Sequence, residues 1–179
     1  MQVIPMAQGR ARVHARLEDA ARQAFIELDF ARALREARQS LRHGPGCWQA
    51  NVLHGDVLCA LGREAEALMA YHRARRLAPH QAEPFWSIST VHSLAGRWEQ
   101  ALRYLDLAQE RLARGDGPLF EWVAEDRACA LFRLGRPEEA LRAIRWGLRR
   151  KPGGRRLREI RAEIRAAGRL RVVGPVLAP

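Results

Sequence analysis

Cysteine is scarce in this sequence of 179 residues. Cys47, Cys59 and Cys129 are widely separated, and no two of them form a CxxC pair. An odd number of distant cysteines argues against a disulfide framework and against a structural zinc site built from cysteines. We therefore expect free thiols and a reducing compartment, the cytoplasm.

Long hydrophobic runs are also missing. No stretch approaches the length of a membrane span, and the first residues, MQVIPMAQGRARVHAR, are interrupted by Pro5, Gly9 and arginines rather than forming the apolar core of a signal peptide. We expect a soluble chain that begins with a flexible basic segment at residues 1–13.

Lysine is nearly absent, since Lys151 is the only lysine among 31 basic residues and the rest are arginine. The net charge is +11, and residues 138–171 hold 12 Lys and Arg against four Glu. A basic end of this kind attracts nucleic acid, anionic lipid or an acidic partner, although a solvated arginine face is the simpler interpretation. The candidate basic patch consists of Arg142, Arg145, Arg149, Arg150, Arg155, Arg156 and Arg158.

Catalytic and metal-binding motifs are missing too. The sequence has no GxxxxGK[ST], GxSxG or HExxH. His43 and Cys47 are four residues apart, but Gly44-Pro45-Gly46 between them keeps the two off one helical face. We expect no catalytic constellation, no cofactor and no metal, and so a binding protein rather than an enzyme.

What the sequence does contain is a period of 34 residues. Small residues recur at this spacing, and the segment Leu134–Pro152 fits the same frame. The pairs are Gly62 with Gly96, Ala67 with Ala101, and Ala74 with Ala108. A fixed period of this size predicts stacked helical hairpins, an all-α solenoid in which each unit buries its apolar face against its neighbours.

Four units and a capping helix follow from this frame. We expect the units to cover residues 14–47, 48–81, 82–120 and 121–154, the cap 155–168, and a tail 169–179. Small residues at unit positions 8, 20 and 27 allow two helices to approach closely, and a large apolar residue at position 24 fills the space between hairpins. Glycine at position 15 permits the turn, and proline at position 32 ends the second helix.

Two places depart from the pattern. In the first unit Leu28 replaces the turn glycine, with Asp29 available to cap the next helix. Five residues are inserted before the last unit, and we place them in Ala113–Phe120 after a lengthened helix. We expect Gly168 to end the capping helix.

The repeats resemble the tetratricopeptide repeat family. The resemblance implies a right-handed superhelix whose first helices line a concave groove, with groove residues at unit positions 2, 5, 9, 12 and 13. On this chain the residues at those positions include Glu18, Arg22, Phe25, Val52, Asp56, Cys59, Glu83, Trp86, Thr90, Ser93, Trp122, Glu125, Cys129, Phe132 and Arg133. Large apolar groups with carboxylates suit a partner peptide or helix that has apolar anchors and some positive charge.

Several alternatives remain open at this point. Trp86 and Trp122 pack between helices in the simpler interpretation. The Lys and Asn with which some family members grip a chaperone's terminal carboxylate are missing, which argues against that ligand. A bacterial secretion chaperone, nucleic-acid or anionic-surface binding through the arginine-rich end, and homo-oligomerisation through the capping helix or the apolar tail Val172–Leu177 are the other candidates.

Overall fold

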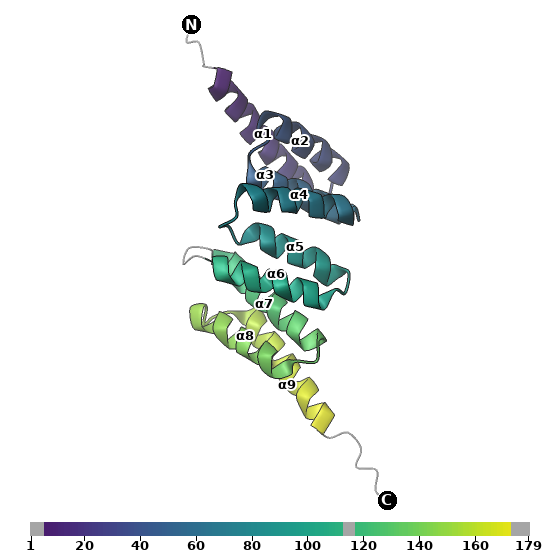
Figure 1. Ribbon diagram of the computed structural model, residues 1–179, viewed down its shortest axis with the longest axis vertical. Helices are drawn as coiled ribbons and strands as arrows, with labels where there is room; N and C mark the ends of the chain where they lie inside the picture. Colours follow the sequence, from purple (N-terminus) through teal and green to yellow (C-terminus); the bar gives the residue numbers. More distant parts are fainter. Residues whose placement is uncertain (1–5, 113–116, 173–179) are drawn as a thin grey trace, which may run out of the picture. The chain divides into compact units, whose positions relative to one another are not determined.

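The computed structural model describes residues 6–112 and 117–172, and in this part of the chain all regular secondary structure is α-helical (Figure 1). The elements are α1 (Met6–Ile26), α2 (Phe30–His43), α3 (Trp48–Ala60), α4 (Glu64–Leu77), α5 (Glu83–Leu94), α6 (Trp98–Arg111), α7 (Gly117–Arg133), α8 (Pro137–Arg150) and α9 (Arg155–Val172). Helices α1 with α2, α3 with α4, and α7 with α8 form antiparallel hairpins joined by short loops. The expected all-α class is confirmed.

The chain divides into two compact units, Met1–Val91 and His92–Pro179. In the first unit α1 pairs with α2 and α3 with α4, and α3 also contacts both α1 and α2. In the second unit α7 packs against α6 and α8, and α9 covers α7 and α8. The core of the second unit joins α7, α8 and α9 through residues such as Leu131, Ile144 and Leu157. The last helix therefore caps the second unit.

The small residues of the repeat lie in the helix interfaces. Position 20 holds Ala33, Ala67, Ala101 and Ala140, and all four are fully buried. Gly55, at position 8, lies so close to Tyr71 that an added Cβ would be 2.4 Å from the ring. Such contact distances explain why larger side chains are excluded from these positions.

The turns between paired helices use left-handed backbone. Gly62, Gly96 and Gly135 have φ of 71°, 69° and 73°. Leu28 adopts the same conformation with φ 61°, although a leucine rarely does so. Asp29 caps α2 as expected, because its side chain accepts a hydrogen bond of 3.0 Å from the backbone N–H of Arg32.

The insertion before the last unit lengthens a different helix from the one we expected. Helix α6 has 14 residues, the same as α2, α4 and α8, and ends at Arg111. Helix α7 has 17 residues instead and begins at Gly117. Pro118 is tolerated there, because the first turn of a helix leaves its N–H groups without intrahelical partners. The remainder of the inserted segment, 113–116, lies outside the described residues.

Both terminal helices extend beyond their expected limits. Helix α1 begins at Met6 rather than at residue 14, because Met, Ala, Gln and Arg are good helix formers. Helix α9 continues through Gly168 to Val172, since one glycine costs a helix only about 1 kcal/mol relative to alanine. Most of the expected tail lies outside the described residues. None of the helices described combines the length and apolar character needed to cross a bilayer.

Candidate functional site

The first helices of the Met1–Val91 unit carry a group of carboxylates around one arginine. Glu18 and Arg22 lie one turn apart on α1, and their Oε1 and Nη2 atoms are 2.9 Å apart. A pair spaced by four residues faces the same side of a helix, so the helix itself brings these groups together. The glutamate side chain is largely shielded and the arginine side chain is open to solvent.

Asp56 on α3 is close enough to Arg22 to feel its charge, and a residue of α4 fixes the position of its carboxylate. The Tyr71 hydroxyl of α4 donates a hydrogen bond of 2.8 Å to Asp56 Oδ1. Tyr71 itself is 3% exposed and packs against Gly55, so its hydroxyl has a fixed position. A small residue at position 8 and a large one at position 24 thus orient the carboxylate at position 9.

Electrostatics link Asp56 to Glu83 on α5. The pKa of Asp56 is raised to about 6, mainly by burial and also by the negative charge of Glu83, although the Tyr71 hydrogen bond and Arg22 lower it. Burial also raises the pKa of Glu83, against the effect of Arg22. We call Glu18, Asp56 and Glu83 with Arg22 the carboxylate cluster. Its three acids and one base leave an excess of negative charge when all are ionised.

The other expected groove residues of this unit differ in accessibility. Val52 is only 4% exposed and belongs to the core, so it offers almost no surface to a partner. Phe25 packs against the core and against Phe30, with ring centroids 5.6 Å apart. Trp86, Thr90 and Cys59 are half-buried, and the Thr90 hydroxyl donates to the Trp86 carbonyl at 3.2 Å. Trp86 is therefore the largest partly open apolar group on α5.

The expected groove residues of the second unit are mostly engaged within it. Glu125 Oε1 lies 2.9 Å from Arg156 Nε of α9, and the Arg133 guanidinium lies 5.7 Å from the centre of the Trp98 ring. Cys129 and Phe132 pack against the core, and burial raises the pKa of Cys129 to about 11. Ser93 is half-buried, whereas Trp122 is 47% exposed. Trp122 is the most exposed apolar side chain of this set.

The repeat pattern and the hairpins agree with a comparison of the sequence with protein families. Residues 27–82 and 125–170, more than half of the chain, match the tetratricopeptide repeat model. The chain belongs to the tetratricopeptide repeat family. A search of curated proteins by sequence gave no match.

Solved tetratricopeptide repeat structures share this fold at low sequence identity. PilF of Pseudomonas aeruginosa superposes with a TM-score of 0.79 at 17% identity, covering 92% of this chain and 72% of PilF. TTC0263 of Thermus thermophilus gives 0.72 at 21% identity, covering 84% and 80%. YrrB, a repeat protein with an unusual peptide-binding site, gives 0.62 at 19% identity, covering 87% and 77%.

The candidate basic patch of this repeat protein is partly neutralised. Arg155 and Arg156 pair with Glu159, and Arg142 pairs with Glu139. The Arg150 guanidinium lies 4.5 Å from the centre of the Phe120 ring. Arg145, Arg149 and Arg158 are exposed, and Arg158 donates to the Gly153 carbonyl at 3.0 Å. All seven arginines of the patch are exposed, but part of their charge is offset by these ion pairs.

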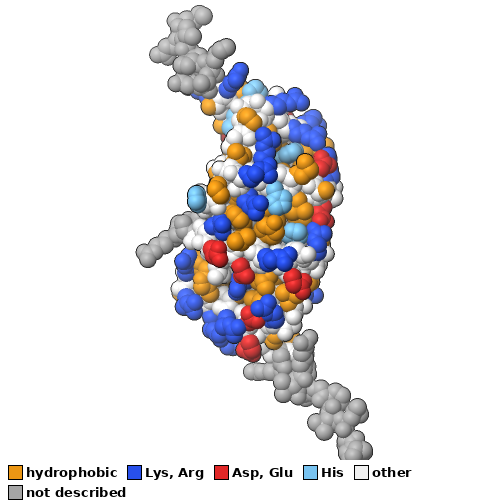
Figure 2. All heavy atoms as spheres, viewed as in Figure 1, with side chains coloured by type: hydrophobic (Ala, Val, Ile, Leu, Met, Phe, Trp, Pro, Cys, Tyr) orange, Lys and Arg blue, Asp and Glu red, His pale blue; other side chains and the backbone are white. Residues whose placement is uncertain are grey.

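The repeat frame did not reveal a hollow of about 700 Å³ in the first unit. It is bordered by residues of α2, α3 and α4, including His54, Met69 and Arg73. Burial lowers the pKa of His54, and Arg38 and Arg63 lower it further, which favours the neutral ring. On the face seen in Figure 2, histidine and Lys or Arg side chains surround exposed hydrophobic ones. Position within the repeat gave no signal for this hollow, because its lining comes from three helices.

Proposed function

We propose that this protein is an interaction module that holds a basic, partly apolar segment of a partner protein against α1, α3 and α5 of its first unit. The observation that carries the proposal is the carboxylate cluster. These half-buried carboxylates share one arginine and therefore lack some of the positive charge that would stabilise their ionised forms. A lysine or arginine of a partner supplies that charge.

Apolar contact supplies the rest of the affinity. Trp86 and Phe25 lie on the same set of first helices and are half-buried, so each has surface left to cover. Large aromatic groups dominate the energetics of protein interfaces, and charged groups around them set the preference among partners. The peptide-binding site of YrrB supports binding of this kind on the same fold.

Selection of peptides displayed on phage against the purified chain tests the proposal. We expect enriched sequences that combine Lys or Arg with large apolar residues, and binding that weakens as salt is added. Glu83→Gln and Trp86→Ala should each weaken a selected peptide by about tenfold or more. The proposal would be contradicted by enrichment of acidic sequences, or by variants that bind the selected peptide as tightly as the unmodified chain does.

Met69→Ala is the matched control for the loss of apolar surface. Met69 lies on the second helix α4 and is 71% exposed, so truncating it removes open apolar surface without touching α1, α3 or α5. Its affinity for the selected peptide should equal that of the unmodified chain. If Met69→Ala lost as much affinity as Trp86→Ala, the peptide would bind on the second helices rather than on α1, α3 and α5.

The other candidates have less support. Most arginines of the basic patch are engaged, and its aromatic neighbours pack against Arg150, so nothing specific favours nucleic acid. A secretion-chaperone role is a narrower form of the same peptide-binding proposal. The apolar tail expected to mediate self-association lies mainly outside the described residues. We retain the cytoplasm as the proposed location, because all three cysteines are free thiols.

A further inference from the structure

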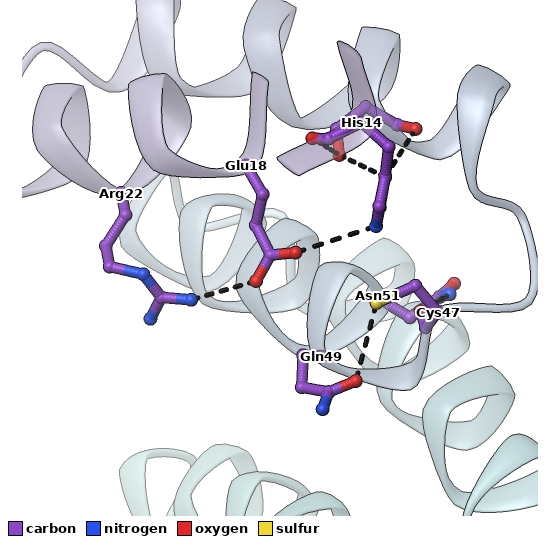
Figure 3. A network of polar contacts seen from close by, with 7 residues as sticks. His14, Glu18, Arg22, Cys47, Gln49 and Asn51 are labelled. Carbon is purple, nitrogen blue, oxygen red and sulfur yellow. Dashed lines mark hydrogen bonds and ion pairs between the residues drawn. The ribbon is translucent and has the colours of Figure 1, made fainter. Parts of the chain in front are cut away.

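Three side chains with metal-binding chemistry meet where α1 passes the start of α3 (Figure 3). They are His14 and Glu18 of α1, and Cys47, which directly precedes α3. One nitrogen, one oxygen and one sulfur from these residues lie within 4.8 Å of one another. We propose that they bind one Zn²⁺ ion, with a fourth position open to water or to a donor from a partner.

The tautomer of His14 favours a cation. Its Nδ1 lies 3.1 Å from the carbonyl oxygen of Ser40 and 2.9 Å from the Ser40 hydroxyl. A carbonyl oxygen only accepts, so Nδ1 carries the hydrogen and, in the neutral ring, Nε2 has the free lone pair. That lone pair faces Glu18 Oε2 at 3.6 Å. Two acceptors facing each other are stabilised by a cation between them.

Surrounding contacts hold each of the three residues in place. The His14 ring rests on Gly44, where an added Cβ would be 2.6 Å from Nδ1. The second oxygen of Glu18 accepts from Arg22, and the Cys47 carbonyl accepts from the Asn51 side chain at 2.7 Å. Histidine ligands with the other ring nitrogen on a carbonyl, and carboxylate ligands with a further hydrogen-bond partner, are the usual arrangement around bound metals.

The spacing suits a small tetrahedral ion. Ligand atoms on a tetrahedral zinc are about 3.4 Å apart, close to the separation of His14 Nε2 from Glu18 Oε2. The ligand atoms lie within 4.8 Å of one another, so the sulfur needs to approach by about 1.3 Å at most, which a change in the Cys47 side-chain torsion can provide. A thiolate and a carboxylate together balance the charge of a divalent ion. Mixed nitrogen, sulfur and oxygen ligands favour zinc over calcium or magnesium.

A bound ion would fasten α1 to the second hairpin. Ser40 of α2 already holds His14, and the loop Gly44–Cys47 leads from α2 into α3. The ion would therefore join elements on both sides of that loop. An open fourth position would also let a partner's side chain complete the coordination.

Cobalt titration of the purified full-length chain, after treatment with a chelator, tests the proposal. Co²⁺ bound by a thiolate in tetrahedral geometry gives a sulfur-to-cobalt charge-transfer band in the near ultraviolet and intense visible bands. We expect these bands to saturate at one Co²⁺ per chain and to disappear when Zn²⁺ is added.

Cys47→Ser should abolish the charge-transfer band, and Cys59→Ser and Cys129→Ser should retain it. Serine is a preferred residue before a helix, so Cys47→Ser should fold at least as well as the unmodified chain without metal. Zn²⁺ should raise the melting temperature of the unmodified chain and leave that of Cys47→Ser unchanged. His14→Gln should behave as Cys47→Ser does.

Three results would overturn the proposal: no charge-transfer band, a band that survives Cys47→Ser, or equal effects of Zn²⁺ on both melting temperatures. In the first case His14 would simply form an ion pair with Glu18 when protonated. Glu18 belongs to both sites, whereas Cys47 lies outside the carboxylate cluster. Cys47→Ser therefore tests the metal site without altering the cluster, and its outcome is distinguishable from that of the peptide selection.

Discussion

Leu28 occupies the same backbone conformation as Gly62, 34 residues later in the sequence. In both turns the residue's own N–H bonds to the carbonyl three residues back, and the next N–H bonds to the carbonyl five residues back. These distances are 3.0 and 2.9 Å at Leu28 and 2.9 Å for both bonds at Gly62. The first repeat thus forms the family's turn with a residue that is poorly suited to it.

Leu28→Gly is expected to stabilise the protein. The left-handed conformation costs a leucine about 1–2 kcal/mol, and glycine adopts it freely. The side chain is 72% exposed, so little buried surface is lost. After the greater flexibility of glycine in the unfolded chain is subtracted, we expect a gain of up to about 1 kcal/mol in the free energy of unfolding, measured with urea.

Gly62→Ala makes the reverse change, because it places a side chain at a left-handed turn position that now has glycine. An added Cβ at Gly62 meets no atom within 4 Å, so any effect comes from φ alone. We expect a loss of about 1 kcal/mol. If Leu28→Gly and Gly62→Ala changed the free energy of unfolding in the same direction, the turn conformation would not explain either result.

Gly55→Ala is expected to destabilise the first unit through its contact with Tyr71. The new Cβ would be 2.4 Å from Cε1 of a buried ring that is also held by Asp56. Overpacking of this kind costs about 1–3 kcal/mol, which exceeds the gain in helix propensity of at most about 1 kcal/mol. Equilibrium urea unfolding gives the difference.

Gly9→Ala provides the comparison at a helical glycine without crowding, because its Cβ would meet nothing within 4 Å. It should leave stability unchanged or raise it slightly. Equal losses in the two variants would show that helix flexibility, and not the contact with Tyr71, governs position 55.

Position in the repeat predicted backbone and packing better than it predicted surface chemistry. The turn at Gly62 and the burial of Ala67 follow from geometry common to every unit, so the period was sufficient for both. Val52 shows the limit, because its position suggested the groove while packing placed it in the core. Ion pairs such as Glu125 with Arg156 depend on the capping helix, which lies outside the period.

The meeting of His14 with Cys47 was also beyond the sequence. Along the chain the histidine nearest to Cys47 is His43, and Gly44-Pro45-Gly46 was expected to keep those two off one helical face. The histidine that approaches Cys47 is His14, which lies on α1, the first helix of the preceding hairpin. Contacts between hairpins depend on helix rotation and loop path, and neither can be read from spacing along one chain segment.

Leu157→Ala should release α9 far more readily than Arg156→Ala. Leu157 is fully buried in the core that joins α7, α8 and α9, and truncating such a residue costs about 2–5 kcal/mol. Arg156 pairs with Glu125 at 2.9 Å but remains open to solvent, where such pairs contribute little. Hydrogen exchange of the α9 amides would show the difference. Equal acceleration in the two variants would mean that charge, not packing, docks the helix.

Asp56→Asn is expected to change how stability depends on pH. The folded chain raises the pKa of Asp56 from 3.8 to about 6, so folding binds its proton more tightly. The resulting stabilisation is complete below about pH 4 and is lost as the pH rises through about 6. Above about pH 6, the ionised Asp56 lowers the free energy of unfolding by about 2–3 kcal/mol relative to a carboxyl with an ordinary pKa.

Asparagine has no charge to bury and still offers an oxygen to the Tyr71 hydroxyl. The difference in free energy of unfolding between Asp56→Asn and the unmodified chain should therefore grow in favour of the variant from about pH 4 to about pH 7, because other titrating groups cancel. Urea unfolding across this range measures it. A difference that stays constant with pH would mean that Asp56 has an ordinary pKa, and that the carboxylate cluster does not carry the electrostatic strain a basic partner would relieve.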